Sequence, residues 1–166
     1  MPAPADVAVA ALIGAALVTD LRARRVPNLL TFGGMALGVS ANALAGDWRV
    51  GLIGAAVAFV VMFPGWRLGG AVRAGDAKLL MAVGAFYGGG EALRAGLLTY
   101  ILALPYGLAI LAARGRLRGV VGAWRAGVAR AMGRDVPEPE LTVVAFVPVV
   151  AAAVWVTRAT DVLRLW

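Results

Sequence analysis

The sequence contains no cysteine and no histidine among its 166 residues. The absence of cysteine excludes disulfides, thiol nucleophiles and thiolate metal sites. The absence of histidine excludes a Ser-His-Asp triad and a histidine-ligated metal. Ser40 is the only serine and Lys78 is the only lysine. Acid–base or nucleophilic chemistry is therefore left to a few carboxylates, to these two side chains, and to some threonines and tyrosines.

Charged residues are also scarce, at 15% of the chain, and long stretches have none, among them residues 50–66, 95–113 and 141–157. Each stretch is near the roughly 20 residues that cross a bilayer as a helix. The chain is 61% hydrophobic, whereas a soluble domain is about 45–50% apolar. The composition therefore predicts an integral membrane protein.

Apolar segments recur six times along the chain, at about 5–20, 28–46, 50–66, 74–90, 92–113 and 141–157. We expect an all-α membrane protein, a bundle of about six transmembrane helices forming a single domain over residues 1–166. The first segment is not expected to be a cleaved signal peptide, because its leading edge has no basic residue and carries Asp6.

Basic residues are distributed unevenly between these segments. Twelve of the 16 lysines and arginines lie in or beside the first, third and fifth connections. The positive-inside rule places those connections in the cytoplasm and both termini outside. The net charge of +7 is therefore assigned to membrane topology and not to nucleic-acid binding.

The long fifth connection, residues 114–140, combines basic residues with an apolar stripe at helical spacing. The stripe consists of Leu117, Val121, Trp124, Val128 and Met132. This pattern favours an amphipathic helix lying on the cytoplasmic membrane surface, attracted to anionic lipid. The alternative is a disordered basic loop.

Two acids occur at the same predicted membrane depth. Asp20 ends the first apolar segment and Asp76 opens the fourth, and both fall on the cytoplasmic side. An ionised Asp costs about 2.5–3.5 kcal/mol at the centre of a membrane helix, and the cost declines toward the interface. Each side chain is therefore expected to face the protein interior or a water-filled cleft.

Two carboxylates that approach closely share a proton, because both cannot ionise cheaply. One can then take a proton from an attacking water while the other donates a proton to a peptide carbonyl. This chemistry requires no metal and no cofactor. Gly75 lacks a Cβ atom, which lets a substrate or another helix approach the backbone beside Asp76. A purely structural alternative pairs Asp20 with Arg22 or Arg24, and Asp76 with Lys78 or with its own helix N-terminus.

Two stretches, VTDLRARRVPNLLTF and AVRAGDAKLLMAVGAFYG, resemble the two signature regions of the type IV prepilin peptidases. These are membrane aspartyl proteases with a Gly-x-Gly-Asp motif, and the closest likeness is to the short, single-domain members that serve Flp-type (tight adherence) pili. The resemblance implies that Asp20 and Asp76 are the catalytic pair. The supporting motif positions are Pro27, Asn28, Arg73, Gly75 and Lys78.

The resemblance also implies a location and a substrate. Such enzymes are multi-pass inner-membrane proteins that remove the basic leader of prepilins and pseudopilins at its cytoplasmic end. The expected partners are therefore these substrates and membrane lipid, without nucleic acid. Two positions depart from the family pattern: Arg73 replaces the first motif glycine, and Ala145 replaces a proline near the last segment. The larger relatives that methylate the new N-terminus carry a Cys-rich domain that this chain lacks, so the resemblance implies peptidase activity without a clear case for methylation.

Local alternatives remain at two motif positions. Asn28 is expected mainly to cap the second helix, with Pro27 as a boundary residue. Lys78 either extends toward the membrane surface or tunes the two aspartates.

Three other functions compete with the peptidase. They are a Ser–Lys protease using Ser40 and Lys78, a proton- or ion-coupled transporter, and a non-catalytic protein of pilus assembly. The Ser–Lys pair is disfavoured because Ser40 lies in the middle of its segment and Lys78 near the cytoplasmic edge.

Overall fold

The computed structural model describes residues 3–69, 72–113, 115, 118–134 and 146–160. The secondary structure of these residues is entirely helical, which confirms the predicted all-α class. In chain order the elements are α1 (Pro4–Ala23), α2 (Asn28–Leu44), α3 (Trp48–Pro64), the π-helical turn η1 (Gly65–Gly69), α4 (Ala74–Tyr87), α5 (Gly89–Ala113), α6 (Arg118–Ala131) and α7 (Val147–Ala159).

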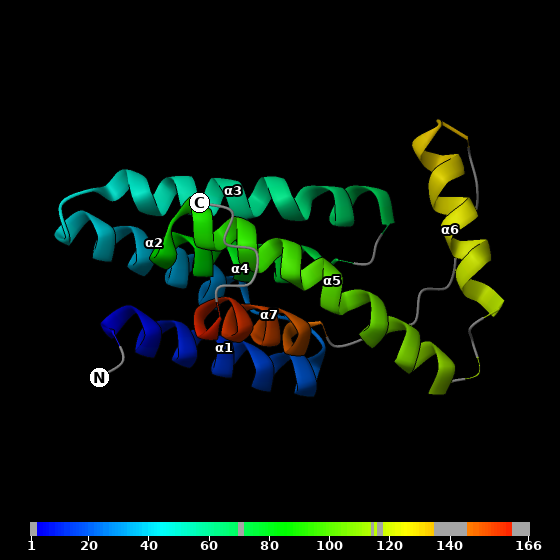
Figure 1. The fold of residues 1–166 in the computed structure, drawn as a ribbon, viewed down its shortest axis with the longest axis horizontal. Coiled ribbons are helices and arrows are strands. Elements are labelled where there is room, and N and C mark those ends of the chain that lie inside the picture. The colour runs from blue at the N-terminus through cyan, green and yellow to red at the C-terminus, as the bar shows by residue number, and fades with distance from the viewer. Residues whose placement is uncertain (1–2, 70–71, 114, 116–117, 135–145, 161–166) are drawn as a thin grey trace.

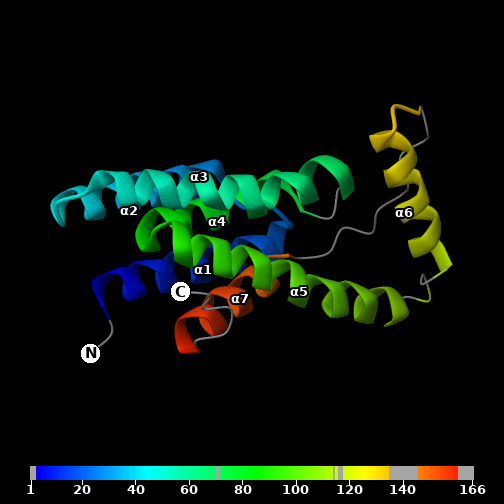
Figure 2. The same ribbon diagram turned by 45° about the horizontal axis from the view of Figure 1, so that its top comes forward.

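Six of the helices run alongside one another, and α6 stands crosswise at one end (Figure 1). The second view shows the same bundle with α6 again at one end of it (Figure 2). Helix α4 is the central element, because it contacts α1, α2, α3, α5 and α7. It buries side chains on all faces, as a helix surrounded by others must.

Small residues allow α4 to pack closely against its neighbours. A methyl group added to Gly54 of α3 or to Gly84 of α4 would overlap the carbonyl of the other glycine. A methyl group on Gly38 of α2 would lie 2.7 Å from the carbonyl carbon of Ala85. Close backbone approach at glycine and alanine is the usual way in which membrane helices associate.

The outward faces of the bundle are strongly apolar. Large hydrophobic side chains with more than half of their surface exposed include Leu29, Leu37, Leu44, Val60, Ile101 and Leu104. A soluble protein rarely exposes so many large apolar side chains together with helices of this length and hydropathy. The chain is therefore an integral membrane protein.

Among the described residues, three helical stretches are long and apolar enough to cross a membrane: Pro4–Ala23, Trp48–Arg67 and Gly89–Ala113. Helix α2 has 17 residues, α4 has 14 and α7 has 13. At about 1.5 Å per residue α4 is about 21 Å long, against a hydrocarbon core of about 30 Å. The predicted count of six crossings therefore remains a prediction, although each predicted segment contains a helix.

The predicted helix in the fifth connection exists as α6 (Arg118–Ala131), and it contacts η1 at the end of α3. Val128 and Met132 are exposed, at 42% and 72% of their surface. Leu117 and residues 135–140 lie outside the described residues. The helix is confirmed, and its attachment to the membrane surface remains a prediction.

Candidate active site

Asp20 lies near the end of α1 and is 98% buried, with only 2% of its surface exposed. Its Oδ2 accepts a hydrogen bond of 3.1 Å from the backbone N–H of Val147. Val147 is the first residue of α7, and the first N–H groups of a helix have no partner within that helix. The Asp20 carboxylate therefore satisfies an otherwise unpaired donor and joins the end of α1 to the start of α7.

Asp76 lies in the first turn of α4 and is equally buried, with 2% of its surface exposed. Its Oδ2 accepts a hydrogen bond of 3.1 Å from the backbone N–H of Arg73. Arg73 is the N-cap residue of α4, so Asp76 closes the helix start in the manner of a capping box. Asp76 therefore lies at the helix N-terminus, where the structural alternative placed it, and its catalytic role remains a prediction.

The two carboxylates lie at the same end of the bundle. Helices α1 and α4 are in contact, and the residues that follow Asp20 and precede Asp76 meet, since Arg73 donates a hydrogen bond to the carbonyl of Arg24. The hydrogen bonds of both side chains to described residues use Oδ2. Among the described residues, each carboxyl group is therefore positioned through Oδ2, and no hydrogen bond to its Oδ1 is seen.

A hydrogen bond between Lys78 and Asn28 joins the two sequence motifs. The Nζ atom of Lys78 donates to Oδ1 of Asn28 over 2.9 Å. The same ammonium group lies 4.9 Å from the centre of the Phe32 ring, within cation–π range. Lys78 is therefore bound to the start of α2, and this contact ties the α4 motif to the α1–α2 motif.

The expected capping role of Asn28 was wrong. Pro27 takes the N-cap position of α2, and no side-chain hydrogen bond caps this helix. Proline at that position fixes an extended backbone, and Asn28 begins the helix with its amide free to accept from Lys78. The boundary role predicted for Pro27 is confirmed.

Comparison with known families agrees with this arrangement. The model of the type IV leader peptidase family matches residues 7–108, which is more than half of the chain and includes Asp20 and Asp76. The chain belongs to the type IV leader peptidase family. No curated protein and no solved structure matches it significantly. Membership in this family implies a peptidase that acts on prepilin-type substrates.

Arg73, at the position of the first glycine in the motif of these leader peptidases, has an exposed side chain. Its Nη1 donates a hydrogen bond to the carbonyl of Arg24. Arg24 is the C-cap of α1 and has a left-handed backbone, with φ of 51°. The substitution therefore adds a link between the α1–α2 connection and the start of α4, just outside the two aspartates.

Gly75, the second glycine of the leader-peptidase motif, has a less crowded setting than expected. A Cβ atom built there would lie 3.5 Å from Cβ of Val26, which is ordinary van der Waals contact. No helix in the described part of the chain therefore requires a glycine at this position. The approach of a substrate beside Gly75 remains a prediction.

Ser40 lies far from the leader-peptidase motifs. It is exposed on α2, twelve residues after Asn28, which binds Lys78. At about 1.5 Å per residue that separation is about 18 Å along the helix. The Ser–Lys alternative is therefore excluded by position.

The sequence-based reasoning missed Val147 as a partner of Asp20. The contact is made by a backbone N–H, a group common to all residues except proline, so the residue type gave no sign of it. The available signal was the stretch AFVPVV, because Pro148 at the second helical position indicates that α7 begins there.

Proposed function

We propose that the chain is a membrane aspartyl endopeptidase in which Asp20 and Asp76 cut the leader from prepilins. The observation that carries the proposal is the pair of buried carboxyl groups contributed by α1 and α4 to one end of the bundle. Both are held by backbone N–H groups and each keeps one oxygen. Paired carboxyl groups of this kind are the catalytic apparatus of aspartic proteases.

The reaction follows from sharing one proton between the two carboxyl groups. The ionised member takes a proton from a water as that water attacks the scissile carbonyl carbon. The protonated member donates its proton to the carbonyl oxygen, giving a tetrahedral diol. The C–N bond then breaks as the proton taken from water passes to the leaving amine, while the other carboxylate takes a proton from one hydroxyl of the diol, which gives the product carboxylic acid and restores the shared proton. Two free Oδ1 atoms, one for each role, are the minimum this cycle requires.

The proposed site faces the cytoplasm of the inner membrane. The end of the bundle that carries the aspartates also carries the basic first and third connections. The positive-inside rule assigns such connections to the cytoplasm. A substrate leader with basic residues would reach the aspartates from water at this edge, without crossing the bilayer.

The substrates proposed are prepilins of type IV or Flp-type pili, and the catalytic unit is the single domain of residues 1–166. The Flp association rests on the resemblance to the short family members. Helix α6 would attach the cytoplasmic end to anionic lipid through its basic and apolar faces. This attachment would keep the entrance close to the membrane surface, where the substrate leader emerges.

The proposal is tested by reconstituting the purified full chain in liposomes with a candidate prepilin. We expect cleavage after the basic leader, identified by N-terminal sequencing of the product. Activity should survive chelators and reagents that modify thiols or serine. Absence of cleavage together with proton flux would favour a transporter, and absence of both would favour a non-catalytic assembly protein.

A further inference from the structure

A pocket of about 480 Å³ lies between α1 and α7, beside the end of α4. Its volume falls within the range of about 300–1,000 Å³ that is typical of small-molecule sites. Most of its wall is apolar and comes from Val7, Val9, Ala10 and Ile13 of α1 and from Val154 and Trp155 of α7. The polar groups are confined to Asp6, Tyr87 and Arg158.

The pocket is remote from the candidate active site. Asp6 and Asp20 are fourteen residues apart on α1, which is about 21 Å along a helix. Asp20 contacts the first residue of α7, whereas Asp6 contacts Arg158 near its last. Helices α1 and α7 are therefore antiparallel, and the pocket lies at the opposite end from the aspartates.

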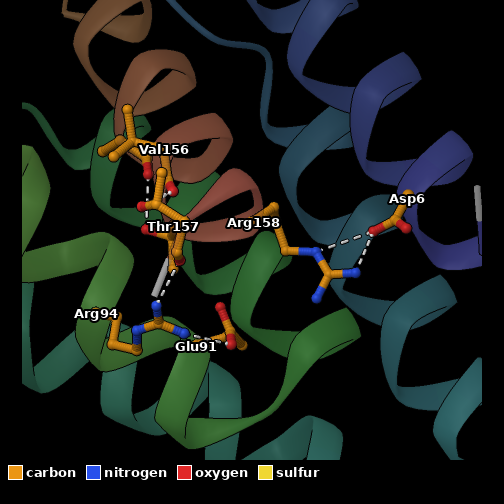
Figure 3. A network of polar contacts seen from close by, with 8 residues as sticks. Asp6, Glu91, Arg94, Val156, Thr157 and Arg158 are labelled. Atoms are coloured by element: carbon orange, nitrogen blue, oxygen red, sulfur yellow. Dashed lines mark hydrogen bonds and ion pairs between the residues drawn. The ribbon is translucent and has the colours of Figure 1, made fainter. Parts of the chain in front are cut away.

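The polar groups of the pocket form one organised cluster. Oδ1 of Asp6 accepts hydrogen bonds from Tyr87 Oη at 2.8 Å and from Nε and Nη2 of Arg158 at 3.1 and 2.8 Å. The guanidinium also lies 4.6 Å from the centre of the Tyr87 ring. Figure 3 shows Arg158 reaching from α7 across to Asp6 on α1. The cluster therefore holds the guanidinium in a fixed orientation.

This cluster leaves one side of the guanidinium available. The contacts of Arg158 with described residues that are given above use Nε and Nη2, and its side chain is 40% exposed. Guanidinium carries five N–H donors, so the Nη1 group can still bind an anion. Asp6 accepts from only some of the N–H donors of the guanidinium. Phosphate oxygens are well matched to the donors that remain.

We propose that this pocket binds a membrane glycerophospholipid, with its phosphate on Arg158 and one acyl chain between α1 and α7. Separation of a cation at one end from an apolar wall matches a molecule with a charged head and an apolar tail. The wall belongs to the first three turns of α1, a helix long and apolar enough to span the membrane. Trp155, with 66% of its surface exposed on that wall, suits the level of the lipid headgroups.

The experiment uses the full chain in liposomes of phosphatidylglycerol and phosphatidylethanolamine that contain traces of a phosphatidylglycerol with a photoreactive acyl chain. Irradiation should label residues 6–13 or 154–159 of the wild-type protein. Ala10→Phe fills the pocket from an exposed position and should lower this labelling by about tenfold, equivalent to the loss of one good contact. Ala11→Phe adds the same ring one position along, outside the pocket lining, and should label as the wild type does.

The headgroup contact is tested by adding the same lipid in increasing amounts to the full chain in detergent and measuring how tightly it binds. Arg158→Gln should weaken binding by about tenfold, as expected when a charge-assisted hydrogen bond is lost, and Arg158→Lys should retain most of it. A photoreactive diacylglycerol, which lacks the phosphate, should label the wild-type pocket weakly.

Three results would overturn the proposal. The first is equal labelling of the wild type and Ala10→Phe, and the second is equal labelling by the diacylglycerol. The third is an unlabelled pocket in a wild-type dimer that Ala10→Phe converts to a monomer, because a second copy would then be the occupant. None of these readouts depends on leader cleavage.

Discussion

At the scale of single residues, Asp76 has an observed structural role and a proposed chemical role in one side chain. One carboxyl oxygen accepts the N–H of Arg73 and closes the start of α4, and we propose that the other binds a reacting water. Asp20 repeats this division, with Val147 at the start of α7 as the donor. An acid at a helix start is thus favourable for the fold, so position alone does not separate the two roles.

A substitution at Gly75 can distinguish an effect on stability from an effect on catalysis. Gly75→Ala should leave thermal stability unchanged, because the new methyl group would meet Val26 at an ordinary contact distance of 3.5 Å. It should lower kcat/KM for prepilin cleavage by about 100-fold, the effect of displacing a substrate by about 1 Å. The measurements are a melting curve in detergent and a cleavage time course.

Gly14→Ala is the matched control, since nothing lies within 4 Å of its added Cβ, and it should change neither quantity. Wild-type cleavage by Gly75→Ala would show that the substrate does not approach this backbone.

At the scale of helices, the fold depends on how closely α3 can approach α4. Gly54 and Gly84 face one another, and each would place an added methyl group against the carbonyl of the other. The amide of Asn42 on α2 donates to the carbonyls of Ala85 and Phe86 at 2.9 and 3.2 Å. These contacts hold α4 at the centre, and α4 carries Asp76.

Gly54→Ala and Gly84→Ala should therefore each lower the free energy of unfolding by about 1–3 kcal/mol, the usual cost of overpacking. Unfolding in mixed detergent micelles measures the change. Gly33→Ala on α2 serves as the control, because its Cβ would have nothing within 4 Å. Unchanged stability in both Gly54→Ala and Gly84→Ala would contradict the close approach of α3 and α4.

The helices could be predicted from sequence because apolar segments and their charged borders repeat clearly along the chain. The bounds of the helices were harder to predict. Helix α4 ends at Tyr87, three residues before the predicted end, because the next residue, Gly88, adopts a φ of 86°. The central position of α4 could not be predicted, because the sequence of a helix that is apolar on all sides does not indicate which helices it contacts. The contact of Lys78 with Asn28 could not be predicted either, since these two residues become neighbours only through the packing of α2 on α4.

At the scale of the whole molecule, the two aspartates and the pocket beside Arg158 lie at opposite ends of the α1–α7 pair. The cation of Arg158 lies at the end with few basic residues, whereas the aspartates lie at the Arg-rich end. This separation gives the molecule a proposed catalytic face and a proposed outer face. It depends on the orientation inferred from the distribution of arginines.

The absence of native cysteine makes this orientation directly measurable with single introduced cysteines. Residues 25, 67 and 125 should react with a membrane-impermeant thiol reagent only from the cytoplasmic side, and residues 47 and 91 only from the outside. The reason is the concentration of basic residues in the first, third and fifth connections. Labelling of residues 25 and 125 from opposite sides would remove the shared depth of Asp20 and Asp76.

The central claim is that Asp20 and Asp76 act as one acid–base pair, and prepilin cleavage by their Asn variants tests it most directly. Asp20→Asn and Asp76→Asn should each lower kcat by about 1,000-fold or more, and the double variant should be little worse, because groups that act as a unit are not additive. Asp47→Asn should cleave as the wild type does, since Asn keeps the N-cap of α3. Substantial cleavage by either single variant, folded in the membrane, would contradict the account.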